Sequence, residues 1–263
     1  MTRTALVLAA HGSRVEPSTN EQLGGLARRI AERNLFDEVT AAFHHGRPTF
    51  ATVLDTLTAD EVIVVPVMTS AGYYSEVVLR RELARNRRFH EVRTRRTVPI
   101  GTHPQIVDLV SNRLERLAQE YDLDPERTTV AVVGHGTASH ADSRRATEAL
   151  AESLTRRRNW GQILAAFLDE EPVVETILQR ANEASVVVIP FLISGGPHAT
   201  VDIPMRLGLP CTGAPVPPFL VFIDSRWVVV DRAIGMDPRI EDLIVDIAMR
   251  SIDLAPMELE TVR

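Results

Sequence analysis

The chain has no lysine, so all 29 of its basic residues are arginine. This absence excludes a Schiff-base lysine and the lysine of a phosphate-binding P-loop. A single cysteine, Cys211, excludes an internal disulfide and an all-cysteine iron–sulfur site within one chain. No apolar run is long enough to span a membrane, and the N-terminus lacks the basic region and cleavage site of a signal peptide. We therefore expect a cytoplasmic protein without a membrane segment or an iron–sulfur cluster.

Acidic residues outnumber basic ones, 35 to 29, and the net charge of −6 argues against a general nucleic-acid binder. The hydrophobic content of 44% is ordinary for a globular protein. A chain of 263 residues lies near the size at which a single core stops growing. These values favour two compact lobes.

An internal duplication runs through the sequence. Five pairs of landmarks recur at one fixed offset of 124 residues: His11 and His135, Phe43 and Phe167, Pro48 and Pro172, Pro66 and Pro190, and Gly72 and Gly196. Further along, residues 100–110 are echoed by residues 234–244 at an offset of 134, so the second copy carries ten inserted residues between Gly196 and Ile234. The period is too long for a solenoid repeat and has the size of a small domain.

Short apolar runs alternate with amphipathic stretches in both copies. In the first copy we predict strands at 4–10, 38–43, 61–67 and 92–99, and helices at 19–34, after Pro48, at 74–88 and from Pro104 to about Tyr121. In the second we predict strands at 129–134, 162–167, 185–192 and near 217–231, and helices at 142–157, after Pro172 and at 237–251. This alternation predicts an α/β fold of two lobes, 1–122 and 123–263, each a parallel sheet of about four strands covered by helices. The polar stretch 122–128 is the predicted linker.

Parallel sheets of this kind place their sites beyond the carboxyl ends of the strands. The residues at those positions are His11 and His135 after the first strands, His44, His45, Asp169, Glu170 and Glu171 after the second, and Tyr73, Tyr74 and His198 after the third. A single loop histidine is most often bonded to backbone. The edge of a sheet formed by the carboxyl ends of its strands is called the rim below. Several histidines clustered with carboxylates on one rim instead indicate a divalent-metal or proton-transfer site.

Three segments resemble the sirohydrochlorin chelatases, which insert cobalt or iron to make precursors of cobalamin and siroheme. They are HGSR at 11–14, the Phe-x-x-x-x-Pro spacing that ends at Pro48, and above all PFLISGGPHATVDIP at 190–204. The resemblance covers nearly the whole chain. It implies two flavodoxin-like lobes with a tetrapyrrole between them, and insertion of Co2+ or Fe2+ into sirohydrochlorin without ATP. No G-x-G-x-x-G or P-loop motif indicates a nucleotide.

By this resemblance, His135 and His198 match the two metal-site histidines of the family. A carboxylate after the second strand joins them, with Asp169 the closest match and Glu170 or Glu171 as alternatives. We take Asp169 and Glu171 into the predicted metal set, and His11 with the two metal-site histidines into the catalytic set.

The first lobe departs from this pattern, because Tyr74 stands in the place of His198 and His45 in the place of Asp169. A phenol is a poor ligand for these metals at neutral pH. We therefore expect a partly degenerate first lobe that contributes to substrate binding, while the second lobe holds the metal. A working first-lobe site of His11, His45 and Tyr74, and a mixed site with His11 reaching across, remain alternatives.

Arginine is concentrated at 80–96. Sirohydrochlorin carries eight carboxylates, and arginine pairs with carboxylates through a two-pronged fork. Arg80 and Arg81 lie nearest the rim and, with Arg14, Tyr74 and His45, form the predicted substrate-binding set. We interpret most of the other arginines in the run as a solvated helix face.

Two other functions fit parts of the sequence. A non-catalytic tetrapyrrole- or metal-binding protein is favoured by Tyr74, and the intact pair of His135 and His198 argues against it. A histidine phosphatase needs an Arg-His-Gly motif, but Ala10 and Gly134 precede the two histidines. Cobalt, nickel and ferrous iron all accept these ligands. The duplication supplies both lobes in one chain, so a monomer can be complete and a homo-oligomer stays open.

Overall fold

The structure is a computed structural model that describes residues 2–137, 140–209, 216–253 and 257. Cys211 lies outside this range. The chain divides into two compact units, one of residues 1–103 with 239–263 and the other of residues 104–238. Within the described residues, no helix is both long and apolar enough to cross a membrane.

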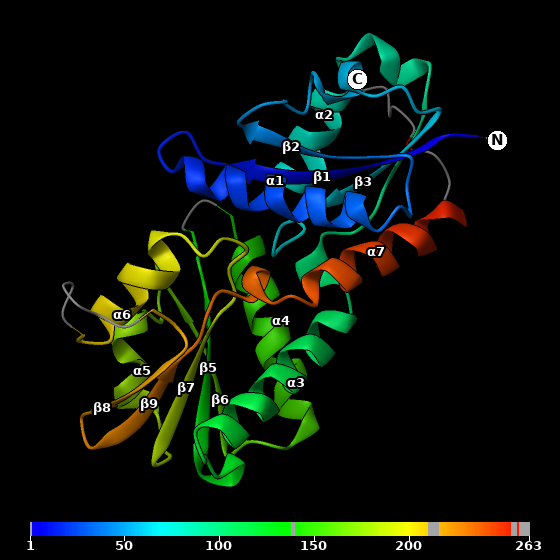
Figure 1. Ribbon diagram of the computed structural model, residues 1–263. Helices are drawn as coiled ribbons and strands as arrows, with labels where there is room; N and C mark the ends of the chain where they lie inside the picture. The colour runs from blue at the N-terminus through cyan, green and yellow to red at the C-terminus, as the bar shows by residue number, and fades with distance from the viewer. Residues whose placement is uncertain (1, 138–139, 210–215, 254–256, 258–263) are drawn as a thin grey trace. The chain divides into compact units, whose positions relative to one another are not determined.

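The first unit is a four-stranded parallel sheet in the order β2-β1-β3-β4. Its strands are β1 (Thr4–Gly12), β2 (Glu38–His45), β3 (Glu61–Pro66) and β4 (Arg93–Arg96). Helices α1 (Pro17–Glu32) and α7 (Ile240–Arg250) lie side by side on one face (Figure 1), and α2 (Leu79–Ala84) covers the other. Because both faces are covered, β1 is an unbroken apolar run in place of an alternating one.

The second unit repeats this plan with one strand more, in the order β6-β5-β7-β9-β8. Its strands are β5 (Thr128–Gly134), β6 (Gln162–Phe167), β7 (Ser185–Pro190), β8 (Phe219–Ile223) and β9 (Arg226–Val230). Helices α3 (Gln105–Glu120) and α4 (Asp142–Arg157) cover one face, and α5 (Ile177–Arg180) and α6 (Ile203–Arg206) cover the other (Figure 1). The predicted fold of two parallel-sheet α/β lobes is confirmed.

The last helix of each copy belongs to the opposite unit. Helix α3 follows the first four strands but packs beside α4, while α7 follows the last strands but packs on β3 and beside α1. The compact units therefore break at residue 103 and at residue 238, and not at the predicted linker 122–128. The helical period shows that α3 has an apolar face, but it does not show which sheet that face covers.

The helices predicted to begin at Pro48 and Pro172 do not form there. In the first unit, the carbonyl of Pro48 accepts the amide of Phe43 at 3.0 Å, and the amide of Phe50 donates to the carbonyl of Phe43 at 3.1 Å. The chain thus returns to pair in parallel with the end of β2, at a bridge between Phe43 and Thr49, before a 3-10 turn at Val53–Thr56. The carbonyl of Pro172 accepts the amide of Phe167 in the same way, at 2.9 Å. Each proline therefore lies next to a bridge with the strand, and the first helical turn begins later, at Val53 and at Val174.

The single strand predicted near 217–231 is a hairpin. Strands β8 and β9 pair antiparallel, and the two turn residues, Asp224 and Ser225, have φ angles of 48° and 62°. These positive values are typical of the two-residue turns that join twisted strands. The hairpin falls within the interval that carries the ten inserted residues. The insertion therefore accounts for the extra edge strand of the second sheet.

Candidate metal and substrate site

The repeated His-Gly pair ends the first strand of each unit. Gly12 and Gly136 adopt φ angles of 69° and 71°, a region that favours glycine. A Cβ at Gly12 would collide with the carbonyl oxygen of His45, and one at Gly136 would lie 2.7 Å from Cγ of Glu170. Nδ1 of His11 lies 3.0 Å from the carbonyl oxygen of Gly12, and His135 repeats this contact at 2.9 Å. The glycine thus lets the strand ends approach each other and fixes the preceding histidine.

Three of the predicted metal residues lie together in the second unit. The rings of His135 and His198 are edge to face, with centroids 4.9 Å apart. Asp169 follows β6, and its Oδ2 lies 3.3 Å from Nδ1 of His135. The side chains of His135, Asp169 and His198 are 45%, 51% and 55% exposed. They are therefore accessible to a metal ion.

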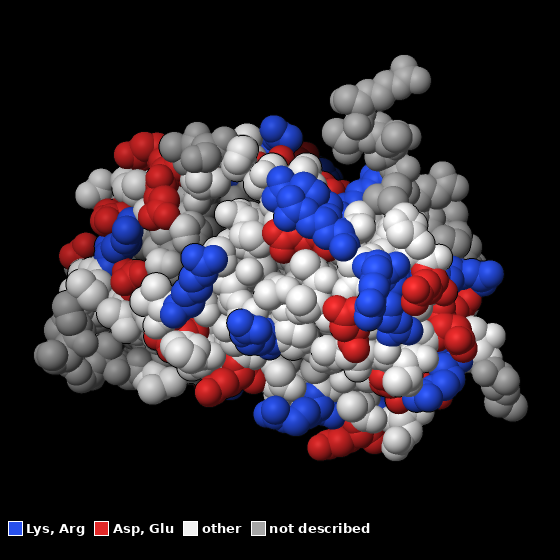
Figure 2. Space-filling model, turned by 90° about the horizontal axis from the view of Figure 1, so that it is seen from above, with Lys and Arg blue, Asp and Glu red and all other residues white. Residues whose placement is uncertain are grey.

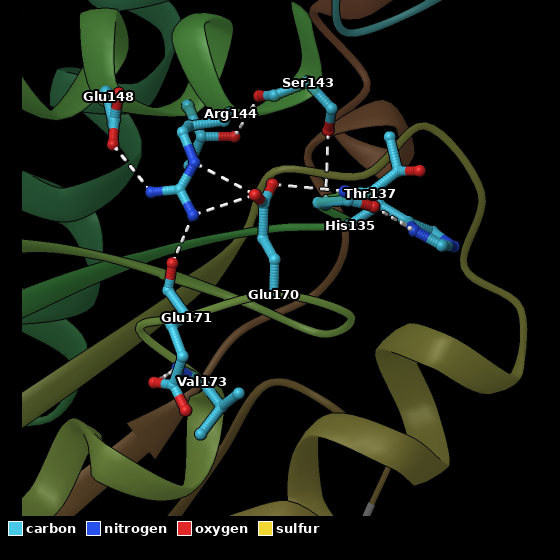
Figure 3. A network of polar contacts seen from close by, with 10 residues as sticks. His135, Thr137, Ser143, Arg144, Glu148, Glu170, Glu171 and Val173 are labelled. Carbon is cyan, nitrogen blue, oxygen red and sulfur yellow. Dashed lines mark hydrogen bonds and ion pairs between the residues drawn. The ribbon is translucent and has the colours of Figure 1, made fainter. Parts of the chain in front are cut away.

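The neighbouring Glu170 and Glu171 are engaged elsewhere (Figure 3). One oxygen of Glu170 accepts the amide of Thr137 at 3.1 Å, and the other accepts Nε of Arg144 at 2.9 Å. This hydrogen bond raises the pKa of Arg144, which keeps the guanidinium charged. Oε2 of Glu171 accepts the amide of Val173 at 3.3 Å. The geometry therefore favours Asp169 among the three carboxylates, and sequence spacing could not distinguish them.

Asp202, which the sequence placed in a motif without a role, is the partner of His198. Its Oδ2 lies 2.6 Å from Nδ1 of His198, across the π-helical turn His198–Asp202 that follows β7. Nδ1 of both histidines thus faces an oxygen, which leaves Nε2 of each ring for a metal or a proton. Within the described ranges, no three histidine, cysteine, aspartate or glutamate side chains already converge to hold a metal ion. Ligation by a third group requires a rotation.

The first unit gathers rings at the same place in its own sheet. His11 lies 4.9 Å from His45 and 4.4 Å from Tyr74, measured between ring centroids. His44 lies 4.3 Å from His45, and its Nδ1 is 3.6 Å from Oε1 of Glu82. Nδ1 of His44 and of His45 is buried without a hydrogen-bond partner among the residues that the structure describes. His44 was not in the predicted substrate-binding set. Its place beside His45 at the end of a strand was the feature of the sequence that could have added it.

Burial and neighbouring charges favour the neutral form of His45. Burial is the main cause that lowers its pKa, and the charges of His44, Arg14 and His11 lower it further, against an opposing effect of Glu82. Arg14 is itself exposed and close enough to act on this ring. The structure thus places His45 and Tyr74 against His11, with Arg14 close enough to act on His45.

At least four of the eight arginines at 80–96 form ion pairs with carboxylates: Arg88, Arg93, Arg95 and Arg96. Arg96 forms a two-pronged contact with Glu76, with both distances 2.7 Å, and Arg93 and Arg95 share Glu61. On the face shown in Figure 2, arginine and acidic side chains lie next to one another. Arg81 is exposed on α2, and Arg80 beside it is half-buried. At least half of the run is therefore engaged in ion pairs, and Arg81 is its exposed member nearest the rim.

Comparison with known proteins identifies the family. The CbiX family model matches residues 5–117 and again residues 129–250. The second match begins 124 residues after the first, which is the offset of the landmarks. The chain belongs to the CbiX family. This membership confirms the resemblance to chelatases that the motifs indicate.

Relatives of this CbiX-family chain match over most of its length. A probable sirohydrochlorin cobaltochelatase of Halobacterium salinarum is 30% identical over 262 residues, which is 92% of this chain and 89% of the relative. A sirohydrochlorin cobaltochelatase of Priestia megaterium is 20% identical and covers 73% of this chain and 65% of its own length.

Solved structures agree in fold. SirB from Bacillus subtilis with Fe3+ superposes with a TM-score of 0.73 at 17% identity, over 97% of this chain and 100% of that chain. DR2241 from Deinococcus radiodurans, a multi-domain protein with structural similarity to chelatases, gives 0.71 at 24% identity over 94% of this chain. The present chain spans about half of DR2241, 55%.

Proposed function

We propose that this CbiX-family protein inserts a divalent metal, cobalt or ferrous iron, into sirohydrochlorin without ATP, and that its second unit holds the metal. The observation that carries the proposal is the edge-to-face pair of His135 and His198 with Asp169 beside it, at the carboxyl ends of a parallel sheet. The names of the Halobacterium and Priestia relatives support sirohydrochlorin as the substrate and favour cobalt.

The arrangement suits a metal that is a substrate. Insertion needs an ion stripped of part of its water and held at the face of the ring, and it needs acceptors for two pyrrole protons. Nε2 of His135 and of His198 supplies two borderline ligands, and Asp169 supplies a third by rotating away from His135. A closed four-ligand site would retain the ion, whereas an open site can pass it on. After transfer, the freed imidazole nitrogens are available to accept the two pyrrole protons.

Apolar side chains beside the histidine support a flat ring as the partner. Val201 and Met205 follow His198 by three and seven positions, and all three are exposed. Residues at this spacing share one face of a helix. In the first unit, Val77 and Arg81 follow Tyr74 at the same spacing and are also exposed. An apolar stripe suits the face of a macrocycle, and an arginine at its end suits a peripheral carboxylate.

An anaerobic spectrophotometric assay with sirohydrochlorin, run with Co2+ and then with Fe2+, tests the proposal. We expect the spectrum of the metallated ring to appear with the wild type and to be lost with His135→Ala. His90→Ala is the matched control, because His90 lies on a 3-10 turn away from the rim. If the wild type binds the ring but inserts neither metal, the alternative of a non-catalytic tetrapyrrole-binding protein replaces this proposal. If His135→Ala inserts at the wild-type rate, the second unit does not hold the metal.

A further inference from the structure

The contact between Asp202 and His198 is short and polar. Oδ2 of Asp202 lies 2.6 Å from Nδ1 of His198, and the two side chains are 36% and 55% exposed. At this distance the contact is a charge-assisted hydrogen bond, in which the imidazole N–H donates to the carboxylate. The four-residue spacing across a π-helical turn brings the two side chains to the same side of the helix.

The first unit offers an internal comparison for this pair. The fixed offset places Tyr74 at the position of His198 and Val78 at the position of Asp202. The π-helical turn is kept in the first unit as Tyr73–Val78, and Val78 is buried there. The copy that lacks the histidine therefore lacks the carboxylate as well, although the backbone is retained. A carboxylate needed only to form the turn would not be lost together with the histidine.

We infer that Asp202 is a positioning residue that acts through His198. It accepts the Nδ1 proton of that ring, which fixes the tautomer and presents the Nε2 lone pair to the metal. The carbonyl of Gly136 does the same for His135, at 2.9 Å. Asp202 does not itself bind the ion in this account. The inference rests on the proposed function only in taking the ion as the species that His198 binds.

The experiment compares Asp202→Val, which installs the residue of the first unit, with Asp202→Asn, which keeps an acceptor but removes the charge. Asp224→Asn is the control, because Asp224 is an exposed carboxylate at the β8–β9 turn and asparagine tolerates its positive φ. Two quantities are measured on the full-length, metal-free protein. One is the tautomer of His198 from its ring 15N shifts, assigned by their loss in His198→Ala, and the other is the affinity for Co2+.

We expect the wild type and Asp224→Asn to show the Nδ1–H tautomer of His198. In Asp202→Val the Nε2–H tautomer should take over, and the affinity for Co2+ should fall by about 10- to 100-fold, as it does when outer-sphere partners of metal-bound histidines are removed. The affinity for Co2+ should fall less in Asp202→Asn than in Asp202→Val. If Asp202→Val does not fold, Asp202→Ala, which also removes the acceptor, decides in its place.

An unchanged tautomer with a Co2+ affinity within about twofold of the wild type would overturn the positioning role. This failure is distinct from a failure of the proposed function. If the wild type inserts no metal, but the Asp202 variants still change the tautomer and weaken Co2+ binding, the positioning role stands and the chelatase proposal falls.

Discussion

At the end of its first strand, each unit carries a histidine held by the carbonyl of the following glycine, at 3.0 Å in one and 2.9 Å in the other. Beyond this shared feature the two rims differ. In the first unit His11 packs against His45 and Tyr74, whose equivalents in the second are Asp169 and His198. The first rim is a packed group of rings, whereas the second is an open pair of imidazoles with carboxylate partners.

This difference shows how a duplicated fold can divide its tasks. The β-strands and the His-Gly pair are common to both copies, so the scaffold alone does not specify the chemistry. Only the residues that follow the second and third strands decide whether a rim presents carboxylates and a second imidazole to a metal. On that basis we propose that the second unit binds the metal and that the first contributes substrate contacts.

The largest effect on the rate of metal insertion should come from a substitution at the rim of the second unit, compared with one at the equivalent position of the first. We expect His198→Ala to lower the rate of metal insertion by about 10²- to 10⁴-fold, the range for loss of a proton-transfer group, while the protein stays folded because rim loops contribute little to the cores. Tyr74→Phe at the equivalent position should change the rate far less. The measurement is the initial rate of insertion, with circular dichroism as the check on folding.

His11→Ala decides between the alternatives in the same assay. Loss of activity in His11→Ala combined with tolerance of His198→Ala would assign the working site to the first unit. Loss in both variants would show that both rims take part in the reaction.

The second-largest effect concerns the ion pairs of α3 and α7, the helices that pack in the unit opposite to the rest of their copy. In the second unit, Arg113 of α3 is buried and donates to Asp231 at 2.8 Å, while in the first unit Arg33 contacts Asp242 of α7 on the surface at 2.9 Å. Arg113→Ala leaves a buried carboxylate unpaired, and we expect the free energy of unfolding to fall by about 3–5 kcal/mol. Arg33→Ala should cost less than about 1 kcal/mol. Urea unfolding of both variants tests the contrast, and equal losses would contradict it.

The stability of the first unit should depend on pH through His103. His103 stands where the second unit has Asp237, and burial lowers its pKa, with Asp246 opposing and Arg250 assisting that shift. The unfolded chain then takes up the proton first, so stability should fall as the pH drops below the ordinary value of 6.5 and should not depend on this group above it. His103→Gln should flatten the decline between about pH 7 and about pH 5 in urea unfolding. An unchanged slope would show that other groups cause it.

How far the sequence predicts this molecule depends on the kind of contact. Strand β6 and helix α4 begin and end where the pattern predicted, because a buried parallel strand is a short apolar run and an amphipathic helix has a clear period. The rim residues followed from the rule that sites lie at the carboxyl ends of strands. The sequence could not predict which sheet the last helix of each copy covers. An apolar helix face can pack on either sheet, and its pattern does not distinguish them.

The same limit applies within the site. Asp169, Glu170 and Glu171 are adjacent in sequence, and only the fold shows that Arg144 takes Glu170 and that Asp169 faces His135. The helices predicted after Pro48 and Pro172 failed for a related reason. The carbonyl of each proline pairs with an amide of the preceding strand, a tertiary contact that overrides local helix preference.

The smallest expected effect concerns Arg81, which stands where the second unit has Met205. Both residues are exposed at the end of the same stripe, one able to pair with a carboxylate and the other only to pack. Arg81→Ala should weaken binding of metal-free sirohydrochlorin by a few-fold, about 1 kcal/mol or less, because an exposed ion pair is worth little. The loss should be larger at low salt, where the charges are less screened. Arg85→Ala, exposed one turn further from the rim, is the control, and fluorescence titration at two salt concentrations is the measurement. If Arg81→Ala and Arg85→Ala bind sirohydrochlorin equally well at both salt concentrations, Arg81 does not contact the substrate. The substrate contacts of the first unit would then come from its histidine and tyrosine rings.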